Sequence, residues 1–206
     1  MDQTISIMGE PNCAKLIDFI PQIKATTVSV PKSVSLVITN SCTPSPKVLT
    51  VGTRYNKRVV ECRMALAAMA IKADKCDLFE DCKYKTFRDL QDDLGFSFEQ
   101  MLKLVEESFS RKSEYTPQMI SKEFDVEDPF IIVRDVPHYL EVKNRNASFD
   151  LYKRAFHVLS EAKRVHDFKK VCEDDSLDEE TKVTRLGELM NQSQESCKDL
   201  YDCSSE

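Results

Sequence analysis

The first forty residues alternate between apolar and polar side chains with the two-residue period of β-strands. This alternation predicts four strands, at residues 3–8, 15–19, 26–30 and 33–39. The last of them, SVSLVIT, is rich in β-branched residues and almost continuously apolar, which is typical of a strand buried on both faces. The two prolines of TPSPK then predict a loop at residues 43–47.

From about Tyr55 onward, the apolar positions recur at intervals of three and four residues, as they do along one face of an α-helix. The stretch RVVECRMALAAMAIKA predicts a first helix, and shorter helices are expected at 86–92 and 97–109. Ser97 and Gln100 form a capping-box pattern, and Thr116-Pro117 has the composition of an N-cap and a first helical position.

Two long helices are predicted at the end of the chain. The first extends from Ala147 to about Cys172, and the second places apolar or small residues three and four apart, at Val183, Leu186, Met190, Ser193, Cys197 and Leu200. The acidic linker CEDDSLDEE between them favours an antiparallel helical hairpin. The pattern as a whole predicts an α+β chain, with a piece of sheet followed by a mostly helical layer.

Charge and hydropathy narrow the range of partners. The 29 Lys and Arg residues against 35 Asp and Glu give a net charge of -6, and no basic block suggests a nucleic-acid surface. No apolar run approaches the roughly 20 residues that span a bilayer, and no signal-peptide pattern is present. We therefore expect a cytoplasmic protein with no nucleic-acid or membrane partner.

Cysteine and glycine usage disfavours two common kinds of site. The eight cysteines include no C-x-x-C pair and fit no usual zinc spacing, which predicts free thiols that pack as small apolar groups and no metal site. The chain has only four glycines, against about fourteen expected at the average of roughly 7%. Because phosphate-binding loops need clustered glycines, we expect no such loop within this sequence.

Spacing alone assigns no chemistry to individual side chains. Asp2 reads as a solvated carboxylate on a strand, Tyr55 as a packing residue before a helix and Lys47 as surface in a proline-rich loop. No catalytic triad or carboxylate pair can be defended from sequence separation.

Five stretches together resemble the galactokinase group of the small-molecule kinase superfamily that is named for galactokinase, homoserine kinase, mevalonate kinase and phosphomevalonate kinase (GHMP). They are MDQTIS, VITNS, YNKRVVECRMALAA, LYKRAFHVLSEAKRV followed by FKKVC, and LGELMNQSQESCKDLYDCS. The resemblance covers nearly the whole chain, most loosely at 74–145. The likeness to eukaryotic N-acetylgalactosamine kinase and its galactokinase relatives is the strongest.

The resemblance implies part of the two-domain α+β architecture of these kinases. Residues 1–80 would supply later strands and one helix of the N-terminal domain, and residues 81–206 the helical part of the C-terminal domain. The family's N-terminal sugar-binding motif, its Gly/Ser-rich phosphate loop and its C-terminal glycine-rich motif have no counterpart here. We therefore expect Met1 to be an internal methionine of a longer protein or the edge of a fragment.

The resemblance also implies roles for three residues. Asp2 matches the catalytic aspartate that lies against the anomeric hydroxyl of the sugar and accepts its proton. Tyr55 matches the tyrosine that packs on the sugar in galactokinases, where N-acetylgalactosamine kinase has Phe, and so it favours galactose. Lys47 matches a lysine on the nucleotide side, although Pro46 stands where that relative has Asn and the loop to Tyr55 is longer.

The implied activity is the ATP-dependent phosphorylation of galactose or N-acetylgalactosamine at the anomeric hydroxyl, with Mg²⁺, carried by a segment without the phosphate loop. The implied partners are therefore a small-molecule sugar and a nucleotide. One alternative is a catalytically silent relative that senses sugar or binds a protein. Another is a truncated gene product without a function of its own.

Overall fold

The computed structural model describes residues 2–35, 37–40, 42 and 54–204. These residues form a mixed α+β structure, which confirms the predicted fold class. The chain divides into two compact units, one from 1–42 and 161–195 and the other from 43–160 and 196–206. The boundary near residue 80 refers to the architecture of a longer kinase, and it stays a prediction.

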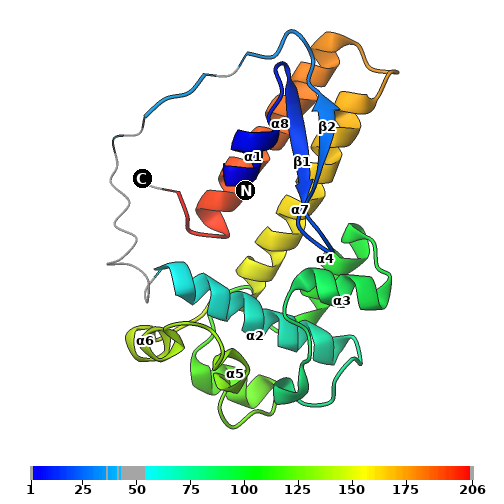
Figure 1. The fold of residues 1–206 in the computed structure, drawn as a ribbon. Helices are drawn as coiled ribbons and strands as arrows, with labels where there is room; N and C mark the ends of the chain where they lie inside the picture. The colour runs from blue at the N-terminus through cyan, green and yellow to red at the C-terminus, as the bar shows by residue number, and fades with distance from the viewer. Residues whose placement is uncertain (1, 36, 41, 43–53, 205–206) are drawn as a thin grey trace. The chain divides into compact units, whose positions relative to one another are not determined.

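The first unit contains an antiparallel hairpin of β1 (Cys13–Asp18) and β2 (Lys24–Ser29), which confirms two of the predicted strands (Figure 1). Cys13 pairs with Ser29 at one end and Asp18 with Lys24 at the other. A small apolar core holds the hairpin to the helices of this unit, with Val28 packed among Leu16, Phe168, Cys172 and Leu186.

The strand predicted at 3–8 is wrong, because Asp2–Met8 forms the helix α1. A strand must satisfy its backbone groups through a neighbouring strand, whereas a helix satisfies them within its own sequence. The Ser6 hydroxyl donates to the Asp2 carbonyl at 2.8 Å, and the Gly9 N–H donates to the Ile5 carbonyl at 2.9 Å. Local hydrogen bonding therefore overrides the alternating pattern.

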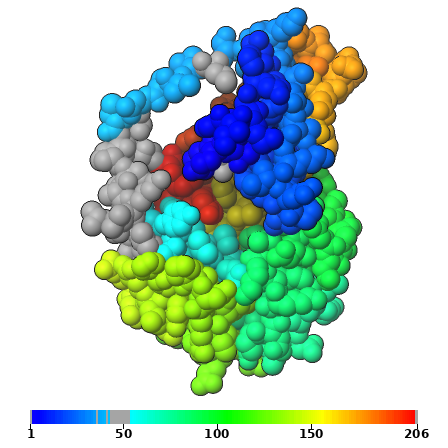
Figure 2. Space-filling model, viewed as in Figure 1, coloured from blue at the N-terminus to red at the C-terminus, as the bar shows by residue number. Residues whose placement is uncertain are grey.

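The strand predicted at 33–39 is also absent from the part of this segment that the structure describes. Val37 is 85% exposed and Ile38 96% exposed, so the expected burial on both faces is wrong as well. In Figure 2 the stretch after Pro31 leaves the hairpin as a thin light-blue chain. Among the described residues β1 and β2 pair only with each other, and no third strand covers this apolar segment.

The second unit is built around α2 (Asn56–Lys72), which confirms the first predicted helix. Seven consecutive residues of α2, from Met64 to Ala70, are at most 1% exposed. The surrounding elements are η2 (Phe79–Asp81), α3 (Phe87–Leu94), α4 (Phe98–Ser108), α5 (Pro117–Glu123), η3 (Ile131–Val133) and α6 (Tyr139–Arg145) (Figure 1). α2 is the central helix of this unit's core.

Side-chain caps define where three of the short helices begin. Thr86, Ser97 and Thr116 each accept a hydrogen bond from the backbone N–H three residues later, as a helix N-cap does. The capping box at Ser97 and the Thr116-Pro117 start were predicted from the sequence, and both are confirmed. Gly95 ends α3 in the left-handed region at φ 64°, where a glycine carries no steric penalty.

Two long helices, α7 (Leu151–Glu173) and α8 (Glu179–Asp199), confirm the predicted pair. Their antiparallel course is clear within the first unit, where the Ser193 hydroxyl donates to the Glu161 carboxylate at 2.8 Å. α7 begins later than the predicted Ala147, because Phe149 is held in a β-bridge with Tyr115 by two backbone hydrogen bonds of 2.8 Å. The predicted apolar stripe of α8 is only partly covered, since Leu186 is buried and Met190 is 61% exposed.

Candidate functional site

Asp2 lies in the first turn of α1, and its side chain is exposed. A carboxylate in this position interacts favourably with the free N–H groups at the start of a helix. The structure thus places Asp2 where solvent and a ligand can reach it. Its catalytic role stays a prediction.

Tyr55 immediately precedes α2 as its N-cap residue, and its side chain is 67% exposed. It makes no side-chain capping hydrogen bond, and the next residue, Asn56, is only 7% exposed. An exposed aromatic ring can pack against the apolar face of a ligand while its hydroxyl forms a hydrogen bond. The ring is therefore available for the predicted contact with a sugar, which stays a prediction.

Lys47, the third predicted residue, lies outside the described residues. Asp2 belongs to the first unit and Tyr55 to the second, so each is placed within its own unit.

Two arginines flank Tyr55 and bind the C-terminal segment of the chain. The Arg58 Nε donates to the Tyr201 carbonyl at 2.7 Å, and its guanidinium also donates to the Asp202 carbonyl. The Asp202 carboxylate lies 3.8 Å from the Arg58 guanidinium and 4.0 Å from that of Arg54. The chain after α8 is thereby held against the start of α2.

Next to this contact, the Tyr201 ring is the centre of a cluster with His157 and two arginines. The ring stacks on His157 with the centroids 4.3 Å apart and the planes 19° from parallel, and it lies 5.4 Å from the Arg58 guanidinium and 5.7 Å from that of Arg154. Burial raises the pKa of the Tyr201 hydroxyl to about 12, although the two arginines oppose this shift. His157 Nδ1 in turn hydrogen-bonds the Ser196 hydroxyl at 2.8 Å.

Glu61, on α2, is a fully buried carboxylate that pairs with Arg154 of this cluster. Its Oε2 accepts from Arg154 Nε at 2.6 Å, its Oε1 accepts from the Asp150 backbone N–H at 2.8 Å, and Lys57 Nζ lies 3.5 Å away. Burial raises the pKa of Glu61, and Arg154, the Asp150 N–H and Lys57 act against that shift. Arg154 also donates to the Leu200 carbonyl, so the ion pair supports the C-terminal segment.

No pattern in the sequence predicted this polar network. The only signal was Glu61, one of two charged residues inside the otherwise apolar run VVECRMA. Its hydrogen-bond partners lie 89 and 93 residues away in the sequence, where spacing rules do not reach. The network orders the start of α2, from which the exposed Tyr55 projects.

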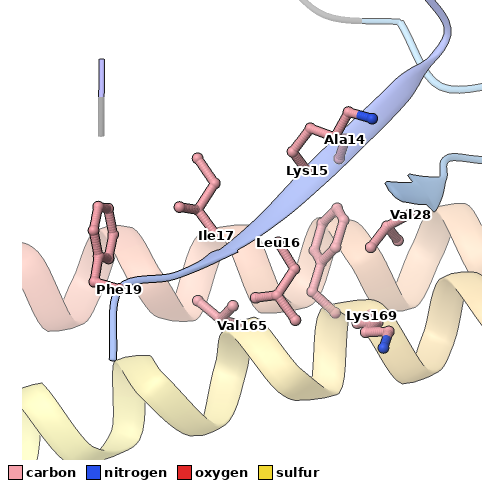
Figure 3. Close-up of a pocket in the computed structure, with 9 residues that line it drawn as sticks. Ala14, Lys15, Leu16, Ile17, Phe19, Val28, Val165 and Lys169 are labelled. Atoms are coloured by element: carbon pink, nitrogen blue, oxygen red, sulfur yellow. The ribbon is translucent and has the colours of Figure 1, made fainter. Parts of the chain in front are cut away.

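A second candidate region lies in the first unit, between the hairpin and α7. An apolar cavity of about 280 Å³ is lined by Leu16, Ile17, Val28, Val165 and Phe168, among others. Figure 3 shows the Leu16 side chain extending from β1 toward α7, beside Val165. The lining is mostly hydrophobic, and its two charged residues are Lys15 and Lys169.

The described residues include no group of three or more His, Cys, Asp or Glu side chains arranged to hold a metal ion. None of the helices in the described ranges is long and apolar enough to cross a membrane.

Comparison with known proteins shows that this chain is similar to sugar kinases. The chain is similar to several galactokinases: that of Dictyostelium discoideum is 37% identical over 99% of this chain, that of Saccharomyces cerevisiae 31% over 99%, and that of Candida parapsilosis 30% over the whole chain. The resemblance to the galactokinase group is thereby confirmed along the full sequence. The chain spans 42–44% of the length of these relatives. No family model matches it.

Proposed function

We propose that this chain carries part of a sugar 1-kinase of galactokinase type. The reaction is the transfer of the γ-phosphoryl group of ATP to the anomeric hydroxyl of galactose or N-acetylgalactosamine. The observation that supports it is 37% identity to a galactokinase across 99% of this chain.

In this proposal Asp2 is the general base. Its carboxylate accepts the proton of the anomeric hydroxyl while the bond from that oxygen to the γ-phosphorus forms. A positioned general base typically contributes about 10²–10⁴-fold to the rate. The exposed carboxylate on α1 is compatible with direct contact to a sugar hydroxyl.

Tyr55 packs against the sugar ring, and its presence in place of Phe favours galactose over N-acetylgalactosamine. Lys47 contributes on the nucleotide side. The Arg58 and Arg154 contacts to residues 200–202 hold the start of α2 in place. The backbone that carries the Tyr55 ring is therefore already ordered before a sugar binds.

ATP and Mg²⁺ are implied by the resemblance to galactokinases. The described residues offer no cluster of three metal-binding side chains, and no Mg²⁺ ligand is assigned among them. We propose a protein of the cytoplasm whose ligands are a small-molecule sugar and a nucleotide, with no nucleic-acid partner.

The alternative is a catalytically silent galactokinase-like protein that senses sugar or binds a protein. The extended apolar segment with Val37 and Ile38 exposed is the observation that favours it, because such surface is usually covered by further protein.

A chimera distinguishes the two proposals. The matching segment of the Dictyostelium discoideum galactokinase is replaced by these 206 residues, and phosphorylation of galactose and of N-acetylgalactosamine is measured with Mg-ATP. The kinase proposal predicts turnover, faster with galactose. A folded chimera that binds galactose in calorimetric titration without turnover contradicts that proposal and supports the silent sugar sensor.

A further inference from the structure

Arg58 lies one helical turn after Tyr55 on α2 and binds the segment that follows α8. Its side chain is only 12% exposed. The Nε donates to the Tyr201 carbonyl at 2.7 Å, the guanidinium donates to the Asp202 carbonyl, and the same group lies 5.4 Å from the centre of the Tyr201 ring. One arginine therefore joins α2 to a segment 143 residues further along the chain.

The start of α2 has no side-chain cap of its own. Tyr55 has helical backbone angles, φ -63° and ψ -61°, and makes no side-chain capping hydrogen bond. The first N–H groups of a helix have no partner within the helix, so an uncapped start frays unless other parts of the protein hold it. Residues three apart in a helix are neighbours on its surface, which places Arg58 beside Tyr55.

The segment after α8 is itself held by backbone hydrogen bonds. The Leu200 and Tyr201 N–H groups both donate to the Ser196 carbonyl, at 3.0 and 3.1 Å, and the Cys203 N–H donates to the Cys197 carbonyl at 3.0 Å. Because these bonds attach the segment to the last turn of α8, it can serve as a rigid support for the start of α2.

We propose that Arg58 is a positioning residue for the sugar contact of Tyr55, and that residues 200–203 are held on α2 more tightly when sugar is bound. The inference rests on the proposed function, since it takes Tyr55 as the residue that packs on the sugar. Opening of the segment frees the start of α2 and weakens the sugar contact. By linkage, bound sugar opposes this opening to the same extent.

Arg58→Lys tests this role in the chimera with the Dictyostelium discoideum galactokinase. Lysine keeps the charge, but it has no planar guanidinium to bind two carbonyls and lie over the Tyr201 ring. We expect KM for galactose to rise about 5-fold, because a smaller fraction of the protein is closed before sugar binds. The value of kcat should change by less than about 2-fold, because saturating sugar restores the closed state.

A second substitution separates positioning from a general loss of structure. In a Tyr55→Ala chimera, Arg58→Lys should no longer raise KM, because the residue through which it acts is gone. Arg63→Lys is the matched control and should leave KM unchanged. Arg63 lies on the same helix with its side chain also 12% exposed, but it binds the Lys85 carbonyl and the Asp135 carboxylate.

Hydrogen exchange measures the coupling without turnover. The Leu200, Tyr201 and Cys203 amides are the probes, since their hydrogen bonds attach the segment to α8. In the unsubstituted chimera, galactose at about ten times its Kd should slow their exchange about tenfold. Arg58→Lys should speed their exchange in the absence of sugar.

The possible results distinguish this coupling from the kinase activity. A chimera that binds galactose with slowed exchange but without turnover contradicts the kinase activity and supports the coupling. Unchanged exchange of the three amides in the galactose complex would overturn the coupling, even with normal turnover. A KM for Arg58→Lys within about 2-fold of the parent, or an equal rise in the Tyr55→Ala background, would overturn the positioning role. A chimera that does not bind galactose would overturn both proposals.

Discussion

The buried carboxylate of Glu61 links three separate parts of the second unit. It lies on α2, accepts the Asp150 N–H just before α7, and pairs with Arg154, which in turn binds the Leu200 carbonyl. Removing one member of such a pair leaves an uncompensated charge in the interior, which is more costly than never having built the pair.

Glu61→Ala should therefore lower the free energy of unfolding by about 3–5 kcal/mol, because the buried Arg154 loses its partner at 2.6 Å and keeps only the Asp150 carboxylate, at 3.6 Å. Denaturant titration at neutral pH measures the change. Arg88→Ala is the matched control, since its i,i+4 pair with Asp92 is exposed on both sides and should cost under about 1 kcal/mol. Equal effects of the two substitutions would show that the buried network does not stabilise the fold.

Tyr201 makes the free energy of unfolding depend on pH in the alkaline range. Its pKa is about 12 in the folded chain, against an ordinary value of 10, so the unfolded chain loses this proton first. The Tyr201 contribution to stability is complete below pH 10 and is lost as pH rises toward 12. Tyr201→Phe should make the fall in unfolding free energy between pH 10 and 12 shallower. An unchanged slope would contradict the shift.

Tyr55 is the residue that we expect to set sugar preference. In the chimera, Tyr55→Phe should lower kcat/KM for galactose by about 2- to 10-fold, the usual value of one hydrogen bond, and change it less for N-acetylgalactosamine. Steady-state kinetics with both sugars measures the ratio. Tyr139→Phe, at a partly buried tyrosine on α6, is the matched control. Loss of both activities in equal proportion would assign Tyr55 a general packing role.

Among the helices, the short ones depend on their first residues. Ser97 is exposed, so Ser97→Ala removes the hydrogen bond to the Gln100 N–H and little packing. We expect a loss of about 1 kcal/mol in unfolding free energy, and a smaller loss for Ser97→Gly. Denaturant titration of both variants tests the order, and an Ala variant as stable as wild type would contradict the capping role.

Helices were predictable from the sequence where their determinants are local. The period of α2 and the caps at Ser97 and Thr116 are contained within a few neighbouring residues, and the structure confirms them. Strands were less predictable, because each needs a partner elsewhere in the chain. Residues 15–19 and 26–30 have that partner in each other, whereas 3–8 became α1.

The candidate site residues also differ in whether neighbouring residues in the sequence could reveal them. Asp2 and Tyr55 could be singled out only by resemblance, since neither position has a spacing that implies chemistry. Glu61 and Arg154 escaped notice because the helical pattern marks buried positions but cannot reveal that a buried charge meets its partner 93 residues later.

Taken as a whole molecule, the chain resembles galactokinases from end to end and yet spans less than half of their length. The exposure of Val37 and Ile38, and of Met190 on α8, is consistent with surfaces that further protein would cover. The kinase proposal therefore concerns these residues when they are joined to the remaining part of a galactokinase. Its decisive test must include that part.

The most direct measurement is the rate of galactose phosphorylation by the chimera with and without Asp2→Asn. We predict a fall of about 10²–10⁴-fold in kcat with nucleotide binding retained, because the amide keeps the shape of the side chain but cannot accept the proton. Asp175→Asn, at an exposed carboxylate between α7 and α8, should leave the rate unchanged. Near-normal turnover in the Asp2→Asn chimera would contradict the role of Asp2 and with it the central proposal.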